Sequence, residues 1–206
     1  IDQQVLDLMY KTQQEDFYNP SSLYRVSNAI HSKLNKSREI IADIIGAESN
    51  EIYFTSGGTE SNNLALFGSL RNKKGKIVTS KVEHASVYNS INELKNRGFD
   101  VVYAPTNKDG TVKTDGFEDL VDENTIMVAL MHVNNETGGI NDIKTLCSKA
   151  KSKNPKCLFF CDGVQSFCKI NANVKNLGID FYSMSAHKIH GPKGVGALWV
   201  SDRIIK

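Results

Sequence analysis

Near its carboxyl end the chain carries the stretch SMSAHKIHGPKG, which is Ser183–Gly194. An apolar run with strand character, residues 179–184, leads into it, and a Gly-Pro-Lys-Gly turn closes it. A lysine just after a strand can bind an aldehyde as a Schiff base, so Lys188 is a candidate, with Ser185 and His187 near enough in sequence to contact a phosphate or move a proton. The alternative is a surface lysine beside a turn, which describes most lysines.

An acidic residue upstream would give Lys188 a partner. The apolar stretch 158–161 is typical of a buried strand and brings Asp162 to its carboxyl end, the edge at which open α/β sheets bind ligands. A carboxylate there can keep a pyridinium nitrogen protonated, and the protonated ring is the electron sink of pyridoxal phosphate chemistry. Taken alone, Asp162 could equally cap the following helix. Its combination with Lys188 favours a cofactor site.

A candidate phosphate site lies in the first half of the chain. Residues 52–55 read as a strand, Gly57 and Gly58 as a turn, and Thr59 as the start of a helix. Glycines let the backbone approach an anion, and the free N–H groups of a helix start attract it. Neither a Walker loop nor the three-glycine spacing of dinucleotide-binding turns is present. An ordinary strand-to-helix turn would look the same.

Two further polar segments follow expected strands. His84 comes after the strand near residues 76–80 and could stack on a flat ring, although an isolated histidine is more often structural. Asn134 and Asn135 follow the next long apolar strand, and their amides suit hydrogen bonding to a phenolic oxygen. Loop chemistry before a helix would equally explain Asn134 and Thr137.

Strands and helices alternate along the chain. Strands are expected near residues 51–56, 76–80, 99–104, 125–131, 157–161 and 179–184. Helices are expected near residues 60–71, 85–97, 115–122 and 142–152. The alternation predicts an α/β fold of three layers, with a mainly parallel sheet and helices on both faces. The last apolar run, residues 196–200, follows a tight turn and could pair antiparallel. No linker interrupts the pattern, which predicts one domain.

One more helix is expected before the first strand. It starts at Asn19-Pro20-Ser21 and ends at Gly46. Its apolar residues follow a helical stripe: Leu23, Val26, Ala29, Ile30, Leu34, Ile41 and Ile44.

Composition excludes several classes of protein. The 206 residues are 40% hydrophobic, enough for a sizeable core, and the net charge of +2 argues against nucleic acid or an anionic membrane as partner. No apolar run approaches the length of a membrane span. Cys147, Cys157, Cys161 and Cys168 lack paired Cys-x-x-Cys spacing, so no metal site is expected. The first three should be buried core residues, and scattered thiols favour a reducing compartment, here the cytoplasm.

Taken together, these segments resemble the cysteine desulfurases of the NifS/IscS type, pyridoxal phosphate enzymes of aminotransferase class V and fold type I. The resembling segments occur in family order across nearly the whole chain. They are Asn19–Ser22, Phe54–Asn63, Glu83-His84, Met131–Glu136, Asp162–Ser166 and Ser185–Gly194. The family commonly has alanine at the position of Gly58 and Ala-Thr at Gly163-Val164.

The resemblance implies a role for each candidate. Lys188 would bind the cofactor as a Schiff base and, with His84, act in catalysis. The phosphate would be bound by Gly58, Thr59, Ser185 and His187, with Ala186 lining the same turn. Around the ring, His84 would stack on the face, Asp162 would pair with the nitrogen, and Asn135 and Gln165 would contact the phenolic oxygen.

The family's reaction converts L-cysteine to L-alanine and passes the sulfur to an enzyme persulfide, then to an iron–sulfur scaffold or another acceptor protein. A homodimer is expected by the same resemblance. The family has a short strand before the position of Ile1, and a small domain beyond Lys206 that holds the nucleophilic cysteine and a substrate-binding arginine. Residues 1–206 are therefore expected to form an incomplete cofactor-binding large domain, unable to complete the reaction alone.

Alternatives remain within and outside this class of enzyme. A selenocysteine lyase, a cysteine C–S lyase or an aminotransferase of the same fold would share Lys188 and Asp162. A catalytically incomplete fragment that binds pyridoxal phosphate, or interacts with the sulfur-acceptor machinery, is the alternative from another class.

Overall fold

The computed structural model describes residues 1–71 and 73–205. Within them, strands β1 to β7 form a single sheet. They are β1 (Ile52–Thr55), β2 (Lys76–Thr79), β3 (Asp100–Tyr103), β4 (Thr125–Met131), β5 (Leu158–Asp162), β6 (Phe181–Ser185) and β7 (Gly196–Val200). Their order across the sheet is β1-β7-β6-β5-β4-β2-β3. Pairs from β6 to β3 are parallel, whereas β7 is antiparallel to both β6 and β1. This confirms the mainly parallel sheet and the antiparallel pairing of the last apolar run.

Helices lie before, between and after these strands. They are α1 (Gln3–Glu15), α2 (Arg25–Ile45), α3 (Gly58–Asn63), α4 (Ala85–Asn96), α5 (Ile143–Lys153), α6 (Val174–Leu177) and α7 (Asp202–Ile205). Among the described residues, no helix has the length and apolar character needed to cross a bilayer.

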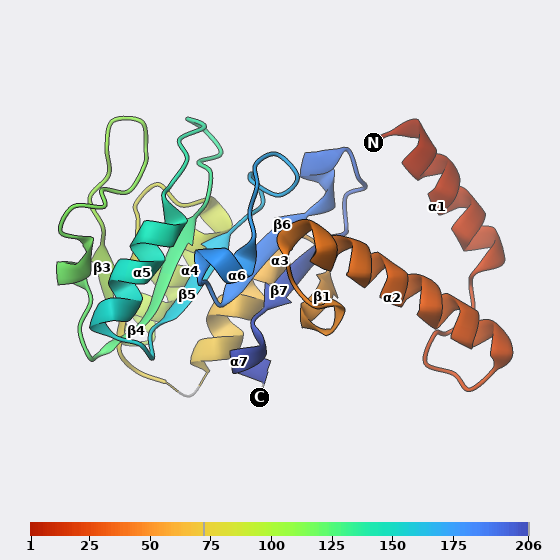
Figure 1. Cartoon of the computed structure of the whole chain (residues 1–206), viewed down its shortest axis with the longest axis horizontal. Helices are drawn as coiled ribbons and strands as arrows, with labels where there is room; N and C mark the ends of the chain where they lie inside the picture. The colour runs from red at the N-terminus through yellow and green to blue at the C-terminus, as the bar shows by residue number, and fades with distance from the viewer. Residues whose placement is uncertain (72, 206) are drawn as a thin grey trace.

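The sheet buries both of its faces, as the three-layer prediction requires (Figure 1). Alternate side chains of β5 show this directly, because the strand is buried at every position. Phe159 and Cys161 join the core cluster that includes α5, whereas Leu158 and Phe160 join the cluster that includes α4. Burying a phenylalanine side chain contributes about 2 kcal/mol, so both clusters hold the strand in place.

The helix before β1 is shorter than the sequence predicted. Asn19 forms a local turn by accepting a hydrogen bond from the Ser21 N–H at 2.9 Å, and α2 begins only at Arg25. Its end is as predicted, with Gly46 in the left-handed conformation at φ 68°. The predicted apolar stripe does not face the core along its length, since Leu23 is 98% exposed.

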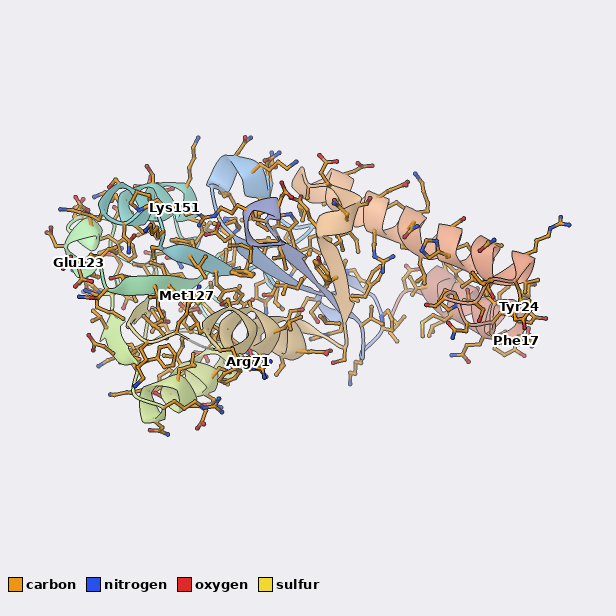
Figure 2. The ribbon with its side chains drawn as sticks, turned by 90° about the horizontal axis from the view of Figure 1, so that it is seen from below. Phe17, Tyr24, Arg71, Glu123, Met127 and Lys151 are labelled. Atoms are coloured by element: carbon orange, nitrogen blue, oxygen red, sulfur yellow. The ribbon has the colours of Figure 1, made fainter. Side chains whose placement is uncertain are left out.

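A second helix, α1, precedes α2 and was not predicted. It has no buried residue, and its N-terminus is capped by the Asp2 side chain. Together α1 and most of α2 form an arm, residues 1–40, that reaches away from the sheet (Figure 1). Figure 2 shows Phe17 and Tyr24 at the far end of this arm, whereas Met127 lies within the sheet region.

Two other predicted helices differ from the structure. The segment expected at residues 115–122 is only a short 3-10 turn, Phe117–Leu120. The segment expected at residues 60–71 begins earlier, at Gly58, and changes after Asn63 into a π-helical turn, Leu64–Gly68.

Candidate functional site

A cavity of about 310 Å³ lies at the carboxyl ends of the parallel strands. Its lining comes from the turn after β1, the start of α4, and the segments that follow β4, β5 and β6. The lining residues are Gly58, Thr59, Asn62, His84, Ser86, Met131, Val133, Asn135, Asp162, Val164, Gln165, Ser185, His187 and Lys188. The structure therefore brings together every predicted site residue except Ala186.

Strand register explains why these segments meet. The last residue of β4, Met131, pairs with Asp162, and Asp162 pairs with Ser183 in β6. Three neighbouring strands thus end at the same edge, with Asp162 in the middle. The loop after β4 and the turn after β6 are consequently placed on either side of its carboxylate.

The turn after β1 and the turn after β6 form one end of the cavity. Gly58 is buried there, and a Cβ atom at this position would lie 2.6 Å from Cγ2 of Val164. Glycine is therefore required while Val164 keeps its position. Ser185 Oγ lies 2.8 Å from Nδ1 of His187, and with the Thr59 hydroxyl these groups offer donors suited to an anion.

Asp162 is almost completely buried, with 4% exposure. Burial raises the pKa of its carboxyl above the ordinary value, while hydrogen bonds from the Val164 N–H (3.0 Å) and the Asn62 amide (2.9 Å) oppose that shift. The bond to Val164 closes a local turn, and no helix starts directly after Asp162, so the alternative in which Asp162 caps the following helix is wrong. Oδ2 accepts only the Asn62 bond among the described residues, so it can accept another from a ligand.

His84 is the N-cap of α4. Its Nδ1 accepts a hydrogen bond from the Ser86 N–H at 3.2 Å and lies 2.8 Å from the Ser86 hydroxyl. A backbone N–H can only donate, so Nδ1 must be the unprotonated nitrogen of the ring. His84, predicted to stack on a ring, therefore also caps α4 by accepting from a backbone N–H in its first turn.

The two neighbouring asparagines have different environments. Asn134 is buried and holds its loop by accepting from the N–H groups of Glu136 and Thr137 and by donating to the Val82 carbonyl. Asn135 is exposed and lines the cavity. The loop interpretation thus describes Asn134, while a cofactor contact by Asn135 stays a prediction.

The remaining predicted residues lie around the Lys188 turn and after β5. Lys188 is exposed to the cavity on the 3-10 turn Ala186–Ile189. Ala186 begins the same turn but does not line the cavity, and its carbonyl accepts a hydrogen bond from the Gly191 N–H at 2.8 Å. Gln165 lines the cavity, and its Oε1 also accepts from Lys169 at 3.0 Å.

Asn62 and Ser86 line the cavity but were not among the predicted site residues. A signal for Asn62 was present in the sequence, since it follows Thr59 by three positions and so shares a helix face with it. Two more buried titratable groups lie near the site. Burial raises the pKa of Glu83 to about 8 and lowers the pKa of His132 to about 4.

The four cysteines all lie in the described part of the chain, and none lines the cavity. Three are buried as predicted, and burial raises the pKa of Cys147 to about 11 and that of Cys157 to about 12. They are therefore thiols rather than reactive thiolates at neutral pH. Cys168 is exposed.

A larger surface hollow of about 620 Å³ lies around Glu51, Asp180 and Arg203. Its buried carboxylates are already paired within the protein: Asp180 with Lys151 and Arg203, and Glu51 with the Trp199 indole. The smaller cavity, with the open acceptor on Asp162 and the cluster of donors at its other end, is the better ligand site.

The residues of this smaller cavity fit pyridoxal phosphate. A buried carboxylate oxygen with spare capacity suits a protonated ring nitrogen, and the donors near Gly58 and Ser185 suit the phosphate. The amine of Lys188 opens into the same space.

Comparison with known proteins gives a consistent result. The model of the aminotransferase class-V family matches residues 1–206. The chain is 42% identical to cysteine desulfurase IscS of Dictyoglomus turgidum over 200 residues, which cover 96% of this chain and 50% of that protein. It is 40% identical to cysteine desulfurase IscS of Clostridium botulinum (strain Kyoto / Type A2) over 204 residues, 98% of this chain and 51% of the relative.

Solved structures agree with these relatives. A structure described as SspA in complex with cysteine superimposes with a TM-score of 0.93 at 38% identity, covering 98% of this chain and 58% of the other. A NifS-like protein superimposes with a TM-score of 0.92 at 36% identity, covering 98% and 56%. The chain thus spans about half the length of the curated relatives it matches.

Proposed function

Because the chain belongs to the aminotransferase class-V family, whose cofactor is pyridoxal phosphate, we propose that it serves in cysteine desulfuration, with residues 1–206 forming part of the cofactor-binding large domain. The observation that supports this most directly is that Asp162 and Lys188 line the same cavity at the strand ends. The identities of 40–42% to cysteine desulfurases support the choice of reaction within the family.

Each residue of the cavity would have a role that follows from its position. Pyridoxal phosphate, when bound, supplies a protonated ring that withdraws electrons from the α-carbon of an amino acid. Asp162 would hold the proton on the ring nitrogen, and His84 would cover the face of the ring. Lys188 would hold the aldehyde carbon covalently and, once displaced by the substrate amine, move the proton of the α-carbon.

The other lining residues would bind and orient. The phosphate would be bound by Gly58, Thr59, Ser185 and His187, with Ala186 in the same turn as the last two. Asn135 and Gln165 would donate to the phenolic oxygen and so fix the ring in its plane.

The proposed substrate is L-cysteine, because the relatives are named cysteine desulfurases and the similar SspA structure is described as a complex with cysteine. The proposed sulfur recipients are an enzyme thiol and then an iron–sulfur scaffold or other acceptor protein. In that transfer a protein thiolate would bond to the substrate sulfur as the C–S bond breaks, giving a persulfide. The bonding electrons would stay with the substrate's β-carbon, which takes up a proton to give alanine. Cys147, Cys157 and Cys161 are buried and protonated, and Cys168 does not line the cavity, which supports a thiolate from outside residues 1–206. We propose the cytoplasm as the compartment because of these free thiols.

Borohydride reduction tests the cofactor site. The chain is incubated with pyridoxal phosphate, reduced, digested and mapped by mass spectrometry. A pyridoxyl label on the peptide that contains Lys188 is expected. Lys188→Ala should remove the label, whereas Lys193→Ala, in the same exposed segment, should keep it. Label spread evenly over surface lysines, or unchanged in Lys188→Ala, would refute the proposal.

Adding L-cysteine to the loaded chain tests the reaction. We expect the cofactor absorbance to change, because the substrate amine displaces Lys188, without turnover to alanine. Repeated alanine release by residues 1–206 alone would contradict the need for an outside thiolate. A response to other amino acids but not to cysteine would favour an aminotransferase.

We further propose a homodimer that buries the arm. The arm exposes many large apolar side chains, an arrangement that favours association. They are Ile1, Leu6, Leu8, Tyr10, Phe17, Tyr18, Leu23, Tyr24, Val26 and Ile40. Sedimentation equilibrium should show a dimer that Tyr24→Glu weakens. Glu123→Lys, at the opposite end of the molecule in Figure 2, should leave it intact. A wild-type monomer would refute the proposal.

A further inference from the structure

Asn62 lies between the two side chains that would contact the cofactor ring. It is on α3 and 1% exposed. Its Nδ2 donates to Asp162 Oδ2 at 2.9 Å and to Ser86 Oγ at 2.8 Å. Ser86 in turn contacts the ring of His84. A continuous chain of hydrogen bonds therefore connects the carboxylate at the strand end to the histidine at the helix start.

The direction of each bond in this chain is determined. An ionised carboxylate only accepts, so the amide nitrogen of Asn62 must face Asp162, and its second proton goes to Ser86 Oγ. Ser86 Oγ, having accepted that proton, uses its own to donate to Nδ1 of His84 at 2.8 Å. The Ser86 N–H donates to the same nitrogen. The neutral ring of His84 is thereby held with its proton on Nε2.

The neighbouring Asn63 shows what a purely structural asparagine does here. Its Oδ1 accepts from Ser90 Oγ at 2.6 Å and so links α3 to α4, without lining the cavity. Asn62 links the same two helices but also lines the cavity, and its Oδ1 is buried without a partner among the described residues. Burying an oxygen without a hydrogen-bond partner costs free energy. A residue that served only to join two helices would not need to carry that cost.

We propose that Asn62 is a positioning residue, which fixes the carboxylate of Asp162 and, through Ser86, the ring of His84 relative to each other. This rests on the proposed function, in which those two side chains contact the nitrogen and the face of one cofactor ring. A single amide sets the angle between the two contacts. It also favours the ionised form of Asp162 by donating to it, as the opposing effect of this bond on the pKa of Asp162 indicates.

The first test uses the chain without cofactor. The carboxyl carbon of Asp162 is followed by ¹³C NMR as pH is raised, in the wild type, Asn62→Ala and Asn63→Ala. Loss of the Asn62 bond should raise the pKa of Asp162, whereas Asn63→Ala should match the wild type. The other titratable groups that act on this carboxyl, Glu83, His84, Cys161 and Tyr182, are unchanged in all three proteins. An Asp162 titration that is the same in Asn62→Ala as in the wild type would overturn the proposal.

The second test measures affinity for pyridoxal phosphate by equilibrium dialysis. Hydrogen bonds to charged groups are strong enough that Asn62→Ala should weaken binding roughly tenfold or more, with no change in Asn63→Ala. Ser86→Ala should weaken binding less. Because both residues act through the same chain of bonds, Ser86→Ala should add little in the Asn62→Ala background. If the losses of affinity in Asn62→Ala and Ser86→Ala added fully in the double variant, Asn62 would have a packing role only. Equal losses of affinity in Asn62→Ala and Asn63→Ala would show the same.

Circular dichroism and thermal melts control for folding. If Asn62→Ala unfolds, it is replaced by Asn62→Leu, which keeps the number and branching of side-chain heavy atoms but lacks the N–H donors. The two hypotheses fail in different ways. If the wild type does not bind pyridoxal phosphate, the proposed function fails, while the Asp162 titration still decides the position of Asn62. If the wild type binds and Asn62→Leu binds equally with an unchanged titration, only the positioning role fails.

Discussion

Gly163, the residue after Asp162, shows how tightly the site is packed. A Cβ atom on Gly163 would lie 2.1 to 2.5 Å from three ring atoms of Tyr182. Tyr182 is fully buried, and its hydroxyl lies 2.6 Å from Ser166 Oγ. Glycine at position 163 therefore leaves room for the ring of Tyr182.

We predict that Gly163→Ala destabilises the chain by about 1–3 kcal/mol, because the ring or the backbone must move to admit the methyl group. Urea unfolding followed by circular dichroism measures the change. The cost should shrink when Tyr182 is replaced by leucine, which removes the clashing ring. Gly68→Ala, where the nearest atom would be 3.8 Å away, is the matched control and should not destabilise. Equal losses for both glycines would contradict this explanation.

At the scale of elements, Glu51 connects the start of the sheet to its end. Its carboxylate is 3% exposed and accepts from the Trp199 indole at 3.1 Å and from the Asp202 N–H at 3.1 Å. It thus joins the segment before β1 to β7 and α7.

Glu51→Ala is expected to destabilise the chain by about 3 kcal/mol, since it leaves a buried indole N–H and a backbone N–H without their acceptor. Urea unfolding again provides the measurement, with Trp199 fluorescence as a local probe. Glu48→Ala is the control: its side chain is 71% exposed and pairs with Lys175 on the surface, so its effect should be much smaller. Similar effects of the two substitutions would argue against the role of Glu51.

The elements whose signal is local were predictable from the sequence. The strands and the polar residues that end them, such as Asp162, follow from apolar runs with a polar residue at the end. The arm was not predictable in the same way, because a helical stripe indicates a helix by its buried face and α1 has no buried residue. Asn62 could have been identified by its helix face shared with Thr59, but its contact with Asp162, 100 positions away, could not be predicted from local sequence.

At the scale of the whole molecule, the buried groups Glu83 and His132 have opposite effects on the free energy of unfolding as pH changes. Glu83 is 8% exposed, and its pKa rises from 4.5 to about 8 on folding. The native state keeps a proton that the unfolded state has lost in this range, so stability falls as pH rises. The pKa of His132 falls from 6.5 to about 4, so the unfolded state binds the extra proton there and stability rises with pH.

We predict that the two effects offset each other from about pH 4.5 to 6.5 and that only the Glu83 effect remains from 6.5 to about 8. Wild-type stability should fall in the upper range, by up to about 1.4 kcal/mol per pH unit. Glu83→Gln should lack this fall. Urea unfolding at several pH values measures the free energy of unfolding of both proteins. As the internal control, the wild type and Glu83→Gln should depend on pH in the same way below pH 4.5. A parallel decline of both proteins above pH 6.5 would exclude Glu83 as its source.

The antiparallel strand β7 also determines the order in which a nascent chain can finish its site. Within the sheet β1 pairs only with β7, and Glu51 beside it contacts Trp199 across 148 positions. During synthesis, the strand that carries the Gly57-Gly58 turn must wait for Gly196–Val200 to leave the ribosome before it can join the sheet. The end of the cavity that Gly58 and Ser185 share is therefore completed only after β7 has been made, although Gly58 is translated early.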